Sequence, residues 1–510
     1  MNPHIMHKPV LIYRLFLPLL LLYLMSPLFS QNKVQFTLDK IIRIAKEQAP
    51  DAILARHRFR ASYWQYRSFQ AIYMPSLKFD ATLPSIDRSI RKNALPEILP
   101  DSSVVFIDQY SRNNSSFYSG SLSLSQNIGV TGGNISLNSG LERTYQIGVM
   151  GSKQFAANPV VNITFNQPLF AFNGMKWDRK IQPLAYEEAK KNYLEAMEQV
   201  SVTAIERFFD LADAQLSMEI SQINFKNNDT LYKIAQDRFN IGAIAENDLL
   251  QMQLSFLNTK TELTKAIIDL EMQKSRLRSF LGYNEKVDFN LLLPDSILNL
   301  KVDYQKVLEL ALNNNPEVIG RQLRLIEANR DLAQAKGQRQ NINLSASLGL
   351  SKSTYGDIAS AYDKPGEGRQ MRIGISVPLI DWGQGRGKVK IAQSNQELIN
   401  MQVQQSQLDF EQNIFLLVMQ FNLQNDQVTI AAKSDTIGQK RYDITKQRFL
   451  IGKVDALNLT DALHAKDIAK RGYVDALRSY WNAFFMLRIT TLFDFIKNQT
   501  LSEEFDNLIE

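Results

Sequence analysis

Hydrophobic and polar residues follow two different periods along this chain, and both periods occur twice in the same order. The stretches that follow Pro75 and Asn341 alternate apolar and polar residues, which predicts strands with one apolar face. Each group of strands precedes a long stretch with an apolar stripe at helical spacing. The pattern therefore predicts an α+β protein with an internal duplication of one helix–strand–helix plan.

The alternating stretches predict four to six short strands. Four stretches precede the first long helix and two precede the second: residues 77–83, 119–128, 134–141, 160–167, 343–351 and 371–378. Residues 84–117 are polar and contain three prolines, so we expect a long surface loop there. This loop belongs to an insertion, residues 84–158, that the second half of the chain lacks.

The helical stretches predict two long helices, from about Met175 to Ile241 and from about Gly387 to Ile451. At about 1.5 Å per residue, each helix extends roughly 100 Å. The other helices are expected over residues 40–73, with an interruption at Ala49-Pro50, and over residues 247–281, 304–336 and 456–495. Helices of this length with narrow apolar seams are typical of antiparallel coiled-coil walls, not of compact enzymes.

One motif occurs twice, since residues 232–249 recur as residues 442–459, an offset of 210 positions. Both copies contain Arg-Phe-x-Ile-Gly, then six residues and a leucine. The positions of interest are Arg238, Phe239 and Gly242 in the first copy and Arg448, Phe449 and Gly452 in the second. Pro168-Leu169 and Pro378-Leu379 keep the same offset. Because one inserted residue would rotate each later side chain by about 100°, we expect an uninterrupted helix between these landmarks.

These patterns divide the chain into a leader, two repeats and a tail. Residues 1–30 resemble a signal peptide, with basic residues before a short apolar run. Residues 31–282 form the first repeat and residues 283–495 the second, followed by a polar, acidic tail, residues 496–510, that we expect to be flexible. No later stretch is apolar enough for a transmembrane helix, so a mature chain that crosses a membrane must use strands.

The composition excludes several classes of function. The 510 residues include no cysteine and four histidines, and the net charge is +6. Disulfides and thiolate chemistry are therefore excluded, and this charge is not the footprint of a nucleic-acid-binding protein. The sequence contains no phosphate-binding glycine loop, no cluster of metal ligands and no nucleophile motif. We therefore predict no enzyme activity and no catalytic, cofactor-binding or metal-binding residues.

Two further segments complete a recognisable set of motifs. Gln167–Gly174 reads QPLF, three residues and glycine, and Val377–Gly383 reads VPLI, two residues and glycine. With the paired glycine turns, they make the chain resemble the TolC-like outer-membrane efflux proteins over residues 37–495. The resemblance implies a homotrimer in outer-membrane lipid, with four strands from each protomer in one 12-stranded β-barrel. The barrel would continue as a long periplasmic α-helical barrel in a Gram-negative bacterium.

The resemblance also implies that the two glycine turns form a periplasmic tip. This tip would dock on an adaptor (membrane fusion) protein, which joins it to an inner-membrane pump. The implied docking residues are Arg238, Phe239, Gly242, Arg448, Phe449 and Gly452. A purely structural interpretation stays open beside this one, because glycine permits the turn and a cation is favoured near the end of a helix. The two phenylalanines could equally pack inside the tip.

Two other groups of residues follow from the resemblance. A constriction of the lumen is expected just after the second turn, with the candidates Asp455, Asn458 and Asp461. An ordinary solvated face is the alternative interpretation of these residues. The expected junction between barrel and helices comprises Pro168, Gly174, Trp177, Pro378, Trp382 and Gly383. Its tryptophans are expected to be interfacial aromatics or, alternatively, to pack between helices.

The sequence thus predicts a passive outer-membrane channel, the exit duct of a tripartite efflux or secretion system. One alternative is a structural coiled-coil protein of the cell envelope. Another is the exit duct of a type I protein-secretion system. A periplasmic enzyme would need a clustered polar pocket, and the sequence offers none.

Overall fold

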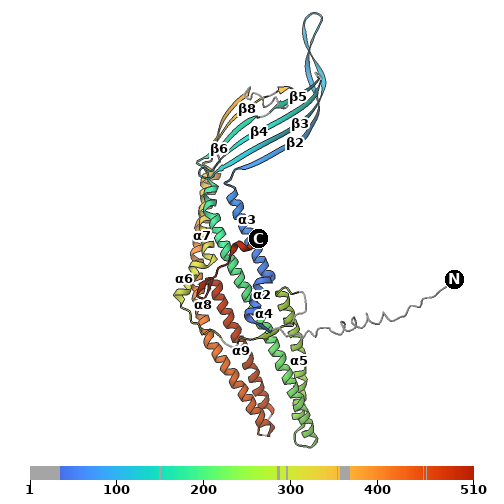
Figure 1. The fold of residues 1–510 in the computed structure, drawn as a ribbon, viewed down its shortest axis with the longest axis vertical. Helices are drawn as coiled ribbons and strands as arrows, with labels where there is room; N and C mark the ends of the chain where they lie inside the picture. The colour runs from blue at the N-terminus through green and yellow to red at the C-terminus, as the bar shows by residue number, and fades with distance from the viewer. Residues whose placement is uncertain are drawn as a thin grey trace, which may run out of the picture. The chain divides into compact units, whose positions relative to one another are not determined.

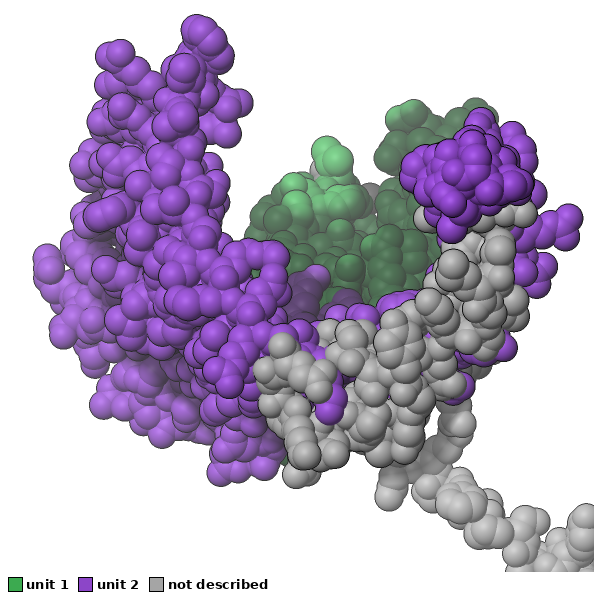
Figure 2. All heavy atoms as spheres, turned by 90° about the horizontal axis from the view of Figure 1, so that it is seen from above, with its two compact units in different colours: residues 1–52, 199–300, 421–485 green, residues 53–198, 301–420, 486–510 purple. Residues whose placement is uncertain are grey.

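The computed structural model describes residues 35–148, 151–157, 159–283, 288–294, 297–352, 354–355, 368–451, 453–454 and 456–509. The predicted leader, residues 1–30, lies outside them. The chain divides into two compact units, drawn green and purple in Figure 2. Unit 1 comprises residues 1–52, 199–300 and 421–485, and unit 2 comprises residues 53–198, 301–420 and 486–510. The units cut across the two repeats, whose boundaries stay a prediction.

An antiparallel sheet makes up much of unit 2. Within the described ranges its strands follow the order β10-β8-β6-β4-β3-β2, and the short strands β5 and β9 pair beside this path. The strands are β2 (Ser76–Ile98), β3 (Val104–Ile128), β4 (Gly133–Gly148), β5 (Gly151–Ala157), β6 (Val161–Leu169), β8 (Ile342–Ser351), β9 (Thr354–Tyr355) and β10 (Gly368–Ser376). Each stretch that alternates in the sequence is therefore a strand, as predicted.

The long surface loop predicted over residues 84–117 is wrong. β2 and β3 continue through this stretch as a paired hairpin that runs on beyond the other strands (Figure 1). The register shifts between Thr82 and Ser85, at Pro84, and β2 is the last strand of the path, where a missing N–H is tolerated. Both faces of this ribbon are largely exposed, so it needs no run of apolar residues.

Helices and the last residues of the chain complete unit 2. Phe59 lies on α3 (Pro50–Ala71) and packs against Tyr193 of α4 (Gly174–Asn240) and against Phe505, with ring centroids 5.7 and 5.1 Å away. Phe505 begins the short 3₁₀ helix η2 (Phe505–Leu508), and the Arg60 side chain donates to the carbonyl of Leu508 at 2.5 Å. The tail expected to be flexible is therefore packed onto α3 and α4.

The single helix predicted over residues 304–336 is also wrong, because proline divides it. α6 (Tyr304–Asn314) ends at Asn315, whose extended backbone precedes Pro316 at the start of α7 (Pro316–Arg339). Proline disfavours helical angles in the residue before it and donates no N–H. The Asn315 side chain accepts from the N–H of Glu317 at 2.8 Å and so caps α7. The break predicted at Ala49-Pro50, between α2 (Leu38–Gln48) and α3, is confirmed.

Unit 1 is mainly helical. It contains α2, the later part of α4, α5 (Glu246–Phe280), the later part of α8 (Gln384–Leu450) and most of α9 (Ala456–Thr491). β1 (Gln35–Thr37) and β7 (Asn290–Leu292) pair in parallel beside them. The fully buried side chains include Phe208, Phe209, Leu211, Phe421, Tyr480 and Phe484. The Tyr480 hydroxyl donates to the carbonyl of Leu298 at 2.6 Å, and burial raises the pKa of Tyr480 to about 12.

The two long helices match the prediction closely. α4 and α8 each contain 67 residues, and α4 continues through Pro183. No helix in the described part of the chain carries an apolar stretch long enough to cross a bilayer.

Candidate functional site

The turn between α4 and α5 depends on Gly242. Its φ is +73°, in the left-handed region that residues with a side chain rarely adopt. The N–H of Gly242 donates to the carbonyl of Phe239 at 2.9 Å, and the N–H of Ala243 donates to that of Arg238 at 2.8 Å. These bonds satisfy carbonyls that the end of a helix leaves without partners. Gly242 therefore has a structural role in the turn.

The turn between α8 and α9 closes with the same bond. The N–H of Lys453 donates to the carbonyl of Arg448 at 2.9 Å, which is the Ala243–Arg238 bond moved by 210 positions. The predicted turn glycine, Gly452, lies outside the described residues, as does Asp455. The two repeats thus end their long helices in the same way.

The phenylalanines of the two motifs have different surroundings. Phe449 packs against a buried cluster of unit 1, which consists of Tyr442, Leu459 and Leu463. Phe239 is 38 % exposed. Phe449 is therefore partly buried against its own chain and Phe239 is exposed, and the docking role of both stays a prediction.

Asp461 lies in an ion pair that the sequence analysis missed. Its carboxylate accepts a hydrogen bond from the Arg441 guanidinium at 2.5 Å, and both side chains are more than half exposed. Asn458 is exposed as well. Arg441 precedes Gly452 by eleven positions and Asp461 follows it by nine, so an antiparallel pair of helices brings them level. Counting outwards from the turn would have found this partner.

A buried polar cluster connects the two helical hairpins of unit 1. The Asn224 amide on α4 donates to a carboxylate oxygen of Asp467 on α9 at 2.9 Å. Lys466 lies 3.2 Å from the other carboxylate oxygen, and its ammonium stands 4.7 Å from the centre of the Tyr442 ring. Nowhere in the described ranges do acidic residues and histidines gather closely enough to hold a metal ion. The hydrogen bond between Asn224 and Asp467 links α4 to α9.

Two grooves lie beside the turns within unit 1. One, of about 520 Å³, is lined by residues of both repeats, among them Arg238, Asp248, Phe449 and Leu457. The other, of about 320 Å³, is lined by Asn228, Ser255, Tyr442 and their neighbours. The mixed apolar and charged lining of the larger groove is suited to a protein segment.

The predicted junction residues lie where strands give way to long helices. Pro168 still pairs with Asn343 across β6 and β8, and Gly174 is the first residue of α4. Trp177 lies in the first turns of α4, with the Lys180 ammonium 5.3 Å from the centre of its ring. Pro378 follows the end of β10 at Ser376.

The second junction has a strained, exposed turn. Trp382 has a φ of +52° and is 95 % exposed, and Gly383 has a φ of +88°. Asp381 accepts from the N–H groups of Gly385 and Gly383 at 2.8 and 3.0 Å, and these bonds hold its pKa below the ordinary value. Trp382 is thus almost fully exposed in the single chain, and its role as an interfacial aromatic stays a prediction.

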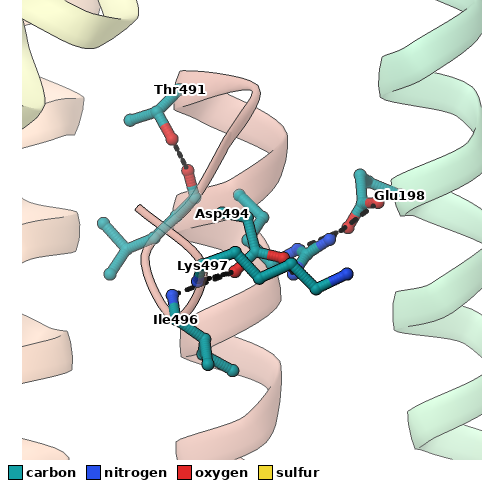
Figure 3. A network of polar contacts seen from close by, with 7 residues as sticks. Glu198, Thr491, Asp494, Ile496 and Lys497 are labelled. Atoms are coloured by element: carbon teal, nitrogen blue, oxygen red, sulfur yellow. Dashed lines mark hydrogen bonds and ion pairs between the residues drawn. The ribbon is translucent and has the colours of Figure 1, made fainter. Parts of the chain in front are cut away.

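A buried ionic network in unit 2 also escaped the sequence analysis (Figure 3). Arg488 of α9 donates to Glu198 of α4 at 2.8 and 3.3 Å and to Asp494 at 2.8 Å. Burial by itself disfavours the Asp494 carboxylate. Bonds from the N–H groups of Lys497 and Ile496, together with the Arg488 charge, nevertheless hold its pKa below the ordinary value. Glu198 and Arg488 are 290 positions apart, and no local pattern signals such a pair.

Comparison with known families adds a second line of evidence. A family described as "Outer membrane efflux protein" matches this chain over residues 134–283 and 307–489. The matched segments make up well over half of the 510 residues and fall in both halves of the chain. No curated protein matches the sequence.

Several solved structures share the fold. The CmeC outer membrane channel of Campylobacter jejuni is 16 % identical, covers 92 % of this chain and 88 % of its own, and has a TM-score of 0.62. The open state of the MtrE outer membrane channel of Neisseria gonorrhoeae is 15 % identical, with coverages of 89 % and 88 % and a TM-score of 0.58. A membrane protein from Pseudomonas aeruginosa is 13 % identical, with coverages of 89 % and 90 % and a TM-score of 0.62. At these identities the likeness establishes a TolC-like fold.

Proposed function

Because this chain belongs to the outer membrane efflux protein family, we propose that three copies of it form the exit duct of a tripartite efflux system. The chain is an outer-membrane channel protein of a Gram-negative bacterium and not an enzyme. The scaffold alternative, a coiled-coil envelope protein without a channel, is therefore wrong. The duct conducts its substrates passively. A periplasmic adaptor protein binds the duct and joins it to an inner-membrane pump.

The observation that carries this proposal is the pair of 67-residue helices. Each begins within a few residues of a sheet strand, α4 after β6 and α8 after β10. Each ends in a turn closed by the same backbone hydrogen bond. A long helix that follows a strand within a few residues lets one chain contribute to both parts of the duct, the barrel of the trimer and its helical tunnel.

We assign adaptor docking to the two turns and the larger groove beside them. Phe239 and Ile241 offer exposed apolar contacts, and Ile241 is 79 % exposed. Arg238 and Asp248 give the groove charges of both signs. Gly242 holds the backbone that presents these side chains, and Gly452 is its sequence counterpart in the second repeat. Arg448 occupies the position on the second hairpin that corresponds to Arg238. Phe449 packs against the cluster of Tyr442, Leu459 and Leu463 beside it.

Asp461, Asn458 and Asp455 remain our candidates for the constriction of the lumen. The Arg441 guanidinium changes what they are expected to do, because it neutralises Asp461 within the same chain. An exposed pair of this kind contributes less than about 1 kcal/mol, so it can exchange partners easily. Asp461 then acts as one half of a weak charge contact that opens when the tip widens.

Single-channel recording in planar bilayers tests the proposal. Purified, detergent-extracted protein is expected to give stepwise currents, and the Asp461→Ala and Arg441→Ala variants are expected to give larger ones. Ser255→Ala, a change in the smaller groove, is the matched control and should leave conductance unaltered. A folded oligomer that gives no current in any of these forms would overturn the proposed function.

A further inference from the structure

The sheet of unit 2 has two chemically different faces, and each face runs unbroken across six strands. Residues that pair directly across neighbouring strands share a face, and sequence neighbours point to opposite faces. One cross-strand row reads Leu77, Leu124, Leu137, Ile163, Leu348 and Met371, in the order β2, β3, β4, β6, β8 and β10. The row on the other face reads Ser76, Ser125, Ser136, Thr164, Ser347 and Arg372.

The apolar face is exposed in the single chain. Leu77 at one end of the row is 70 % exposed and Met371 at the other end is 72 % exposed. The four side chains between them are all at least 41 % exposed. An apolar face of this extent requires an apolar environment, and the alternation with a polar face is that of a wall between lipid and water. β6, β8 and β10 contain 9, 10 and 9 residues, close to the 9–11 or so that span a bilayer.

The inserted strands β3 and β4 take part in both rows. They lie within residues 84–158, the insertion predicted from the sequence, and they help to make four strands of the path before α4 against two before α8. Phe79 on β2 faces Leu122 on β3, and Ile135 on β4 faces Phe165 on β6, so the apolar contacts continue through the insertion. A separate accessory hairpin would have no reason to keep this register.

The two ends of the sheet are matched to each other. Among the described residues, β2 pairs only with β3, and β10 pairs only with β8 along the path. Successive strands alternate in direction, so with six of them β2 and β10 run in opposite directions. β10 of one copy can therefore add to β2 of the next in the same antiparallel manner. An open edge in lipid would leave a row of N–H and C=O groups without partners, which is prohibitively costly.

We propose that each copy contributes six strands to the membrane wall, so that three copies close an eighteen-stranded barrel in place of the twelve-stranded one implied by the family resemblance. The number three rests on the proposed function, whereas the six strands per copy rest on the rows described above. Barrel diameter grows roughly linearly with strand number, so this lumen is about 1.5 times as wide as a twelve-stranded one. The polar row that would face the lumen consists of serine or threonine on five of the six strands.

Single cysteines test whether β3 and β4 belong to the wall, since the native chain contains none. Leu122→Cys and Leu137→Cys are expected to place a fluorescent label in lipid, where a quencher on the acyl chain reaches it. Ser123→Cys and Ser136→Cys are expected to place it in water, where iodide quenches it. Quenching by iodide at all four positions of the reconstituted protein would overturn the proposal.

A matched pair on β6 separates this result from a failure of the proposed function. Ile163→Cys and Asn162→Cys should alternate between lipid and water whether the barrel has four or six strands per copy. If this pair alternates and the β3 and β4 pairs do not, the insertion lies outside the wall. If none of the pairs alternates, the sheet is not a membrane wall and the proposed function fails with it.

Disulfide trapping tests the closure between copies. Lys78→Cys on β2 is combined in turn with Gln370→Cys, Arg372→Cys and Gly374→Cys on β10, all on the polar face. At least one combination should yield a ladder of linked species that ends at three chains. Ser123→Cys with Gln370→Cys is the control, because β3 is an interior strand and should not link. Linking in the control together with none at the edges would overturn the proposal.

Discussion

The two halves of the chain have long helices of equal length and unequal numbers of strands. α4 and α8 contain 67 residues each, whereas four strands of the sheet path precede α4 and only two precede α8. An added residue in a helix rotates everything after it, so the coiled-coil wall resists a change in length. A sheet accepts an added hairpin, because two strands return the chain to the same edge in the same direction. The difference teaches that the number of strands in this fold can change far more easily than the length of its long helices.

The largest effect is expected from changing the length of one long helix relative to the other. One alanine inserted after Asp426 in α8 should rotate the rest of the helix by about 100° and turn the buried side chains beyond it, among them Val428 and Tyr442, away from the core. We expect complete loss of the heat-modifiable oligomer on gels of outer membranes. One alanine inserted after Ser102, in the turn of the β2–β3 hairpin, is the control and should assemble normally. Normal assembly of both variants would show that helix length is not constrained.

A second prediction compares the buried Arg488 with an exposed cation, Lys233. Arg488→Met leaves Glu198 and Asp494 buried without this cation, which should cost about 3–5 kcal/mol in the free energy of unfolding. Lys233→Met should cost less than about 1 kcal/mol, because its ion pair with Asp229 is exposed. Urea unfolding of the purified protein measures both. Equal losses would contradict the role given to the network of Figure 3.

The two turns should respond alike to the same change. Gly242→Val forces a β-branched residue to a φ of +73°, at a cost of about 1–3 kcal/mol, and Gly452→Val should match it. We expect weaker co-purification of the adaptor while the amount of protein in the outer membrane stays near normal. Gly472→Val, in the middle of α9 where an added Cβ meets nothing within 4 Å, is the control. Normal adaptor binding by well-expressed turn variants would count against docking at the tip.

The smallest effect is expected from shortening the hairpin that extends past the sheet. Replacing residues 90–112 with Asn-Gly should change the unfolding free energy by no more than about 0.5 kcal/mol, because the removed ribbon is largely exposed. The Lys92–Asp108 ion pair at 2.6 Å is lost with it, but exposed pairs contribute little. Conductance and oligomer stability are the measurements. A strong loss of either would mean that this ribbon contacts another copy.

Periodic patterns of apolar residues in the sequence predict most of the fold. The long helices, the Gly242 turn and the alternating strands are all local features, and each agrees with its sequence pattern. The errors arose where local signals conflict with context: Pro84 and Pro96 suggested a loop, yet an end strand tolerates both. Pro316 begins α7 just as Pro50 begins α3, although only the break at Pro50 is predicted from the sequence.

The candidate site was less accessible from sequence. The turn motifs could be found because they repeat, and Asp461 because it follows a turn. Its partner Arg441 could have been found by counting outwards across the same turn. The Glu198–Arg488–Asp494 network, in contrast, joins positions 290 residues apart. Such contacts depend on which helices pack together, and one sequence alone carries no local trace of that choice.

The contact between Arg60 and Leu508 also bears on the order of events in biogenesis. It joins residues 448 positions apart, so it cannot form until residue 508 has left the ribosome and crossed the inner membrane. The packing of Phe59 against Phe505 likewise cannot form until Phe505 has been exported. Until then, the part of α3 that these residues cover stays exposed, so α3 completes its packing only at the end of synthesis and export.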